Sequence, residues 1–306
     1  MINVNFTLSQ FQLENMDFSQ EYKRYLANFS LLTKESFELS IQMSELLLNF
    51  REVSNDDVSN DDFLLLSLFS KIALNADSIL TLLPKGDPRS FIGTENSKFL
   101  DLSSIASLSR DVIDASNALF YLFTERVGDS EHEFRVLLFG LHGWMRQKEF
   151  IESVGGPNQE MLFNVSIEVD KFKNQLEANS FFKGLEGEKV KRIFKRTEGR
   201  IENVKAAMFL TRREITRIRG IDLSFSDAIY MFFSSHVHSF LMSVSLVGQT
   251  ITLSEKSLLF LLLTIKYAAY YLGLSLVDAT MLFPEVKEKL SFESKELLAN
   301  IVQGKF

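Results

Sequence analysis

The stretch FLLLSLFSKIALNADSILTLL, residues 63–83, decides the fold class of this chain. Its apolar residues recur at helical spacing over a length that ordinary strands do not reach, and Pro84 ends it. The preceding SNDDVSNDD, residues 54–62, is typical of a loop whose last aspartates suit a helix N-terminus. This part of the chain therefore predicts a long apolar helix that is entered from an acidic loop.

The same spacing continues through most of the chain, and residues that break helices are rare. Only 14 Gly and 4 Pro occur in 306 residues, which favours long helices over a many-turned β protein. Apolar residues make up 46% of the chain and include 29 Phe, so we expect a substantial, Phe-rich core. The sequence predicts an all-α fold, a single multi-helix bundle of about nine to eleven helices without a convincing strand.

We expect one helical domain over residues 1–306. The connection richest in breakers is KGDPRSFIGTENSK, residues 85–98. The loop at 84–100 is therefore the best candidate for a boundary, which would separate an N-terminal helical part, 1–84, from a main helical part, 101–306.

Composition excludes several kinds of chemistry. The chain has no cysteine, so it has no disulfide, thiolate metal site or Cys nucleophile. It also lacks a Gly-rich phosphate loop, a G-x-S-x-G elbow and an H-E-x-x-H motif, and we expect no metal and no cofactor. The first twenty residues show no secretory signal, which predicts a bacterial cytoplasmic protein. Proteins that bind nucleic acid are usually basic overall, so the net charge of −7 does not favour nucleic-acid binding by the surface as a whole.

The apolar run SLLFLLLTIKYAAYYLG, residues 257–273, is seventeen residues long, the lower limit for a membrane span. Lys266 lies in its middle, where a lysine costs about 3 kcal/mol on insertion scales. Polar groups also share one side of the helix: Thr264, Tyr267, Tyr271, Ser275 and Asp278. We therefore expect a central helix that is buried on most sides, and no membrane partner.

The segment SDAIYMFFSSHVHSF, residues 226–240, carries the most informative polar pattern. On a helix its apolar side includes His236, which we expect to be a core histidine with a hydrogen-bond partner. The other side carries polar groups at i, i+3, i+7 and i+11: Asp227, Tyr230, Ser234 and His238. This stripe is either a polar seam between packed helices, with His238 fixing their register, or a catalytic or ligand-binding row.

The segment resembles an uncharacterised family of helical bacterial proteins, a domain of unknown function. The resemblance lies in a late motif of Tyr, Ser and His followed by Ser: Tyr230, Ser234, His238 and Ser239. A middle element similar to QLEANSFFKGL, residues 175–185, also fits the family. The resemblance covers residues 100–245 and implies a helical fold, without an established activity.

An earlier helix of that family has an Arg followed by an acidic residue four positions on. In SLSRDVIDASNALFYLF, residues 107–123, Arg110 and Asp114 are similar to this pair, although the family more usually has Glu where Asp114 stands. Asn117 and Tyr121 share the same helix face. Arg110 and Asp114 can pair along the helix, and a deeper role would require this face to meet the His238 stripe.

A second resemblance is to the HEPN-type ribonucleases, in which four to six residues separate an Arg from a following His on one helix. Arg135 and His142 have six residues between them and share a helix face. In that chemistry the His acts as acid or base and the Arg stabilises developing phosphate charge. Val136 departs from the pattern, because the family has a polar residue after the Arg.

The region from Lys183 to Arg219 carries twelve Lys or Arg and five Glu, a net charge of +7. Such a patch can bind phosphate, and RNA through 183–219 is one expected partner. The residues expected to bind are Lys191, Arg192, Lys195, Arg196, Arg200, Arg212 and Arg213. The other interpretation is intramolecular, with the patch neutralising the acidic N-terminal half of the chain.

Two functional classes follow from these patterns. The first is a helical interaction module with a protein partner, in a bacterial stress or phage-defence setting. The second is a metal-independent, HEPN-like ribonuclease. They differ in whether Arg135 and His142, or Arg110 and His238, meet in one open cleft.

Overall fold

The computed structural model describes residues 17–54, 60–85, 100–154, 159–185, 187–197, 200–237 and 255–305. This part of the chain is 82% helical, with twelve helices, ten of them of seven or more residues, and one two-stranded hairpin. The all-α class predicted from apolar periodicity is therefore confirmed. The chain divides into two compact units, unit 1 (residues 1–124 and 212–306) and unit 2 (residues 125–211).

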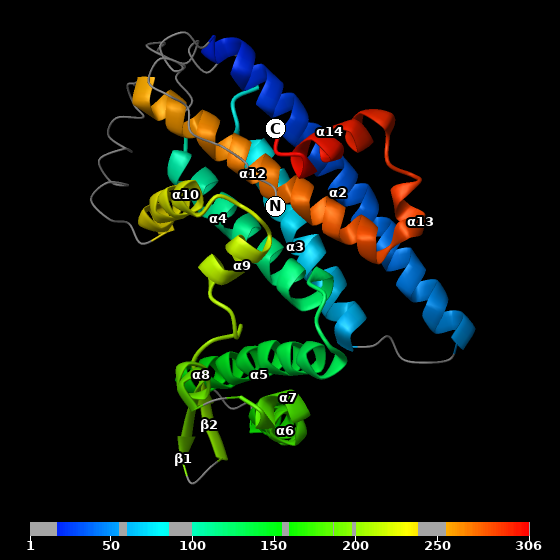
Figure 1. Ribbon diagram of the computed structural model, residues 1–306, viewed down its shortest axis with the longest axis vertical. Helices are drawn as coiled ribbons and strands as arrows, with labels where there is room; N and C mark the ends of the chain where they lie inside the picture. The colour runs from blue at the N-terminus through cyan, green and yellow to red at the C-terminus, as the bar shows by residue number, and fades with distance from the viewer. Residues whose placement is uncertain are drawn as a thin grey trace. The chain divides into compact units, whose positions relative to one another are not determined.

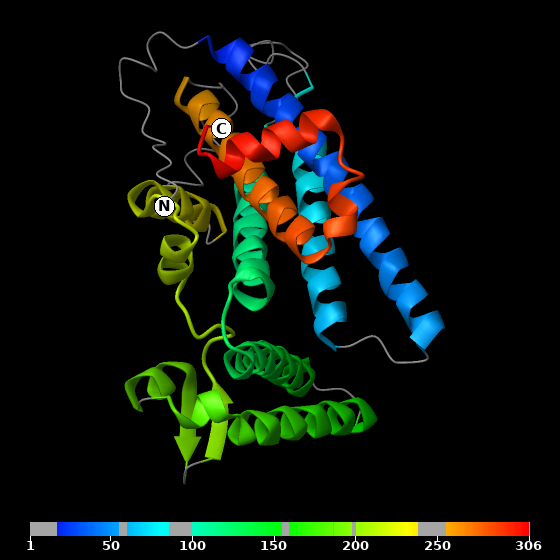
Figure 2. The ribbon, with the colours of Figure 1, turned by 45° about the vertical axis from the view of Figure 1, so that its right-hand side comes forward.

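Four long helices form the body of unit 1 and lie side by side in Figures 1 and 2. They are α2 (Phe18–Ser54), α3 (Asn60–Leu82), α4 (Leu102–Leu119) and α12 (Glu255–Leu282). α2 packs on α3, α3 on α4, α4 on α12, and α12 on α2 again, so each long helix has two long neighbours. The amphipathic periodicity of the sequence is satisfied by this mutual burial.

Shorter helices cover this body. The π-helical turn η2 (Phe120–Thr124) continues α4, α9 (Arg212–Ile218) and α10 (Leu223–Val237) contact α4, and α13 (Pro284–Lys287) and α14 (Phe292–Val302) contact α12. At the contact of α12 with α14, a Cβ on Gly273 would lie 2.2 Å from Cδ1 of Ile301. Glycine at this position therefore allows the two helices to approach each other closely.

The apolar run at 257–273 lies within α12, a central helix of unit 1. Within the described residues, two helical stretches are long and apolar enough to cross a membrane, Asp61–Leu82 and Ser257–Leu282. In the most apolar window of the second, 72% of residues are buried inside the protein, against 39% in the first. This burial supports the interpretation of 257–273 as a core helix, and the expected lack of a membrane partner stays a prediction.

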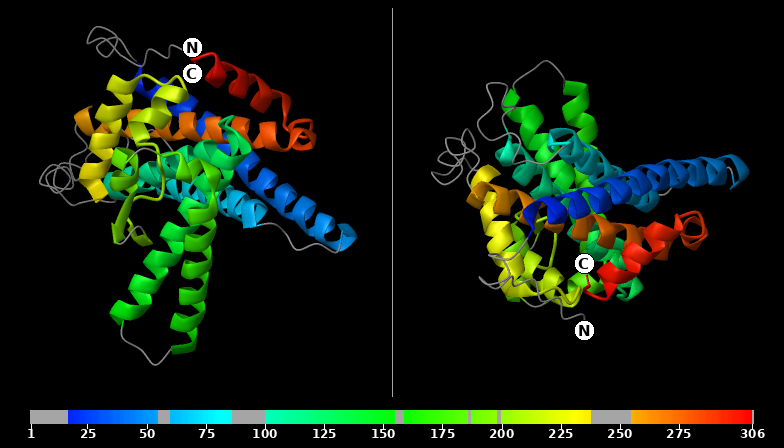
Figure 3. Two further views of the ribbon diagram at one scale, coloured as in Figure 1. Left: turned by 60° about the horizontal axis from the view of Figure 1, so that its bottom comes forward. Right: turned by 90° about the horizontal axis from the view of Figure 1, so that it is seen from above.

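Unit 2 is built on a pair of long helices, α5 (Asp129–Val154) and α6 (Gln159–Ala178), which lie side by side in Figure 3. A Cβ on Gly140 of α5 would lie 2.5 Å from the ring of Phe172 on α6, so the glycine makes room for this ring. The rest of the unit comprises α7 (Ser180–Lys183), α8 (Gly187–Ile193), β1 (Phe194–Thr197) and β2 (Arg200–Val204). Phe134, Phe182 and Phe194 are buried in its Phe-rich core.

The expectation that the chain has no convincing strand is wrong for β1 and β2. The two strands pair antiparallel, with Phe194 opposite Val204 and a register shift between Lys195 and Arg196. Phe194, Ile201 and Val204 are buried while most of their neighbours are exposed. The two buried residues of β2 are three positions apart, so the hairpin lacks the two-residue alternation that would indicate a strand in the sequence.

The division into units falls between residues 124 and 125 and between residues 211 and 212. The expected boundary at 84–100 lies mostly outside the described residues, because 86–99 are not described. The partition of the chain into 1–84 and 101–306 stays a prediction.

Candidate functional site

The two polar faces singled out in the sequence meet in unit 1, where α10 packs on α4. Nε of Arg110 on α4 donates a hydrogen bond to the hydroxyl of Tyr230 on α10 (3.2 Å), and that hydroxyl donates to Oδ2 of Asp114 (3.2 Å). Arg110 and Asp114 also form the ion pair expected from their spacing, at 3.5 Å. The Tyr230 stripe is therefore in direct contact with the face that carries Arg110.

A second arginine approaches Tyr230 from α9. The guanidinium carbon of Arg212 lies 4.2 Å from the centre of the Tyr230 ring, a cation–π distance. Arg212 also forms an ion pair with Asp227 and donates to Oγ of Ser226 (3.2 Å). Arg213 contacts the same carboxylate at 3.0 Å. We call Arg110, Asp114, Arg212, Asp227 and Tyr230 the tyrosine cluster.

Burial and charge act against each other in the tyrosine cluster. Burial raises the pKa of the Asp114 carboxyl, while the Tyr230 hydrogen bond and Arg110 act to lower it. Burial and the charge of Asp114 raise the pKa of Tyr230 above its usual range. The Tyr230 hydroxyl therefore stays protonated near neutral pH and holds α10 to α4 as a hydrogen-bond donor, rather than acting as a base.

The remaining members of the α10 stripe are less well defined. Ser234 is half-buried. His238, and Ser239 after it, lie outside the described residues. Every charged member of the tyrosine cluster has a partner of opposite charge in the chain, which favours the polar-seam interpretation over a ligand-binding row.

A deeper polar network connects α4 and α12 beyond the tyrosine cluster. Arg219, with a 3% exposed side chain, pairs with Asp278 at 2.8 Å and donates to Oγ of Ser116 and Oδ1 of Asn117. Ser275 donates to Ser116 at 2.8 Å. Burial raises the pKa of Asp278 to about 6, against the attraction of Arg219. Ser275 and Asp278, the last two residues of the polar stripe expected on residues 264–278, thus join helices inside the protein.

His236 is a core histidine, as the sequence predicts. It is 5% exposed, and its Nδ1 lies 2.9 Å from Oγ of Ser103 at the start of α4. Its ring also packs edge-on against Phe232, at 4.7 Å between ring centres. Burial lowers the pKa of the imidazole, so the neutral form is favoured.

The two residues of the ribonuclease pattern have different surroundings in unit 2. Arg135 is 2% exposed and pairs with Glu125 (2.6 Å) and Glu131 (2.5 Å). His142 is half-buried, and burial together with Arg146 lowers its pKa. The described structure therefore places Arg135 in a buried ion-pair network rather than beside His142 in an open cleft.

The basic segment 183–219 is divided between the two units. Arg212 and Arg213 belong to the tyrosine cluster or its edge in unit 1. The other five residues expected to bind are exposed around α8, β1 and β2 of unit 2: Lys191, Arg192, Lys195, Arg196 and Arg200. Arg212 and Arg213 are neutralised within the chain, as the intramolecular interpretation expects. Their acidic partner, Asp227, lies outside the N-terminal half.

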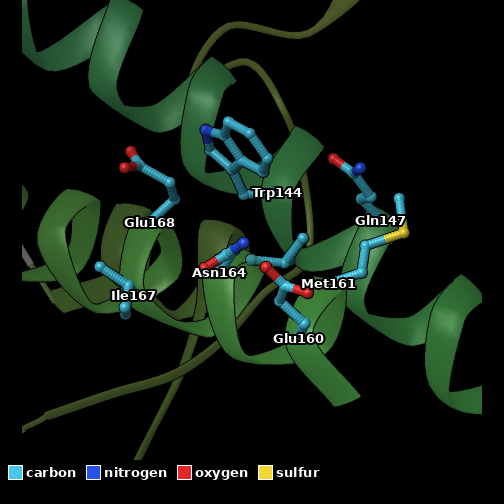
Figure 4. A pocket seen from close by; sticks show the side chains of 8 residues that line it. Trp144, Gln147, Glu160, Met161, Asn164, Ile167 and Glu168 are labelled. Carbon is cyan, nitrogen blue, oxygen red and sulfur yellow. The ribbon is translucent and has the colours of Figure 1, made fainter. Parts of the chain in front are cut away.

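Sequence reasoning missed a groove between α5 and α6, with a volume of about 490 Å³. Trp144 and Gln147 line it from α5, and Glu160, Met161, Asn164, Ile167 and Glu168 line it from α6. Figure 4 shows the indole of Trp144 above Asn164, with Glu168 to its left and Gln147 to its right. The sequence signal was available, because Trp144 is the single tryptophan of the chain.

Among the residues that the structure describes, no three His, Asp or Glu side chains gather closely enough to hold a metal ion. Comparison of the chain with protein-family models, with curated proteins and with solved structures finds no match. The arguments for function therefore rest on the chain's own geometry.

Proposed function

We propose that the protein is a helical interaction module and that its partner protein docks on the paired helices α5 and α6. The observation that carries the proposal is a concentration of large apolar side chains that are exposed on these two helices: Phe150, Val154, Met161, Phe163 and Ile167. Single exposed apolar residues are ordinary, but a cluster on one pair of helices is typical of an interaction surface. The bacterial stress or phage-defence setting expected from the sequence is part of this proposal.

The extent of the apolar surface favours a protein partner over a small ligand. Met161 and Ile167 line the groove at Trp144, whereas Phe150 and Phe163 lie outside its lining and are 67% and 65% exposed. A small molecule in the groove would leave these rings in water. A helix laid along α5 and α6 could cover them together with the groove.

The charge of the groove indicates the chemistry of the partner. Glu160 and Glu168 line it beside the indole of Trp144, and a carboxylate and an aromatic face both attract a cation. Lys171 lies 3.5 Å from Glu168 but remains half exposed, so that pair is weak and easily exchanged. We therefore propose an amphipathic helix with basic residues beside its apolar stripe.

The single tryptophan makes the proposal testable with the full chain. A Leu/Lys amphipathic helical peptide should bind saturably and shift Trp144 emission to shorter wavelength, because docking removes the indole from water. The charge-inverted Leu/Glu peptide should produce no shift. An equal response to both peptides, no response to either, or a matching shift with lipid vesicles alone would overturn the proposal.

The geometry does not add support for the ribonuclease alternative. Arg135 is committed to Glu125 and Glu131, and the cation that acts on His142 is Arg146, which itself pairs with Glu149. Ribonuclease activity remains a sequence prediction.

A further inference from the structure

The described part of α8, β1 and β2, with the residue that follows β2, exposes many cations and few anions. Seven Lys or Arg side chains are exposed there: Lys189, Lys191, Arg192, Lys195, Arg196, Arg200 and Lys205. Two exposed glutamates lie among them, Glu188 and Glu202. We call these seven cations the hairpin surface. Unlike the chain as a whole, it is strongly basic.

The contacts of the hairpin surface differ from those of the arginines farther along the segment. Arg219 is held in a nearly dry pair with Asp278. On the hairpin surface, Lys191 pairs with Glu188 at 3.1 Å, and both side chains are more than three-quarters exposed. Exposed pairs of this kind contribute at most about 1 kcal/mol, so a phosphate can replace the glutamate. Burial therefore does not hold these lysines in place.

The hairpin itself favours one kind of anionic polymer. Phe194 and Phe209, the aromatic residues of this basic segment within unit 2, are 2% and 6% exposed, so neither offers a face on which unpaired bases could stack. An antiparallel two-stranded ribbon, in contrast, is an element that a duplex groove can admit. Lys195 and Arg200 stand on the exposed part of that ribbon.

From these observations we propose that the hairpin surface binds the phosphate backbone of a double-stranded nucleic acid, without reading its sequence. Lysine and arginine side chains neutralise phosphates and release counterions, and this contribution does not depend on base identity. The proposal is independent of the peptide-binding function of α5 and α6, because it uses different residues and a ligand of opposite charge.

The test measures binding of a fluorescent duplex to the full-length protein by anisotropy over a salt series. We expect log K to fall with log salt at a slope of about −3 to −5, which corresponds to about three to six phosphate contacts. The variant Lys191→Ala/Lys195→Ala/Arg200→Ala should weaken binding and make the slope shallower by about 3. A matched control, Lys287→Ala/Lys289→Ala/Lys305→Ala, removes the same charge from exposed positions in unit 1 and should bind as the parent does.

A gain-of-binding variant guards against loss of folding as an explanation. Glu188→Gln/Glu202→Gln removes the two anions from the hairpin surface and should tighten duplex binding several-fold at low salt. Duplexes of unrelated sequence should bind alike. The proposal would be overturned if no duplex bound at low salt, or if the triple alanine variant of the hairpin surface and Glu188→Gln/Glu202→Gln both bound as the parent does. Equal binding of poly-glutamate would also overturn it, because it would indicate an acidic protein partner.

Discussion

The hydroxyl of Tyr230 on α10 donates a hydrogen bond to Oδ2 of Asp114 on α4 at 3.2 Å, and it joins two residues that are 116 positions apart in sequence. Arg110 donates to the same hydroxyl, so the tyrosine is fixed from both sides. Polar residues that look catalytic in the sequence are thereby used to hold α10 on α4. Both surfaces proposed for partners lie on unit 2.

Tyr230→Phe should lower the free energy of unfolding by about 0.5–1.5 kcal/mol, because it removes the hydroxyl that connects Arg110 and Asp114. Denaturant unfolding followed by circular dichroism measures the loss. In a double-mutant cycle with Asp114→Ala, we expect a coupling of about 0.5–1 kcal/mol. Purely additive effects of the two changes would contradict the seam.

His236 should make stability depend on pH below neutrality. Burial lowers its pKa below the ordinary 6.5, so the folded protein holds it neutral while the unfolded chain binds a proton. Its contribution is therefore present above pH 6.5 and is lost as the pH falls through that value toward the folded pKa. Unfolding of the wild type and of His236→Gln between pH 7 and pH 5 should show a shallower dependence in the variant.

The matched control for that experiment is His142→Gln. The pKa of His142 is also lowered, by burial and by Arg146. This variant should remove a separate share of the pH dependence and leave the share of His236 in place. Identical slopes for the wild type and His236→Gln would show that the core histidine does not titrate as described.

Two glycines of α5 should respond in opposite directions to alanine. Gly143→Ala adds a Cβ with nothing within 4 Å and should raise the free energy of unfolding by about 0.5–1 kcal/mol, the helix propensity of alanine over glycine. Gly140→Ala places a Cβ 2.5 Å from the Phe172 ring and should lower it by about 1–3 kcal/mol. Equal stabilisation by both would contradict the close packing of α5 on α6.

The sequence predicts the helices well because long amphipathic patterns depend on local spacing. At the start of α4, Asp101 accepts a hydrogen bond from the backbone N–H of Ser104 at 2.9 Å, as aspartate commonly does at a helix N-cap. The polar stripe of α12 is equally visible, since residues 264–278 are close in sequence. What it joins is not visible, because its partners Ser116 and Arg219 lie on other segments.

The remaining features depend on long-range packing or on short elements. The meeting of Tyr230 with Arg110 is a question of how two helices pack, which spacing alone does not answer. The hairpin of β1 and β2 was missed because its strands are short and highly charged. The structural role of Arg135, in contrast, has a local signal, because Glu131 precedes it by four residues and forms its ion pair.

The ribonuclease alternative can be tested directly on RNA with EDTA present. With Arg135 buried in ion pairs, we expect no cleavage that depends on His142. The comparison is between purified wild type and His142→Ala, with folding checked by circular dichroism. Cleavage that disappears in a folded His142→Ala variant would contradict this expectation and restore the enzyme interpretation.

Trp144 emission tests most directly whether a partner helix docks on α5 and α6. The measurement titrates a Leu/Lys helical peptide into the wild type, into Phe163→Ser/Ile167→Ser, and into the control Phe292→Ser, which changes an exposed ring in unit 1. We expect saturable binding in the wild type and the control, and at least a tenfold weaker affinity in the α6 variant, about 1.4 kcal/mol. Equal affinity in all three proteins would contradict the claim.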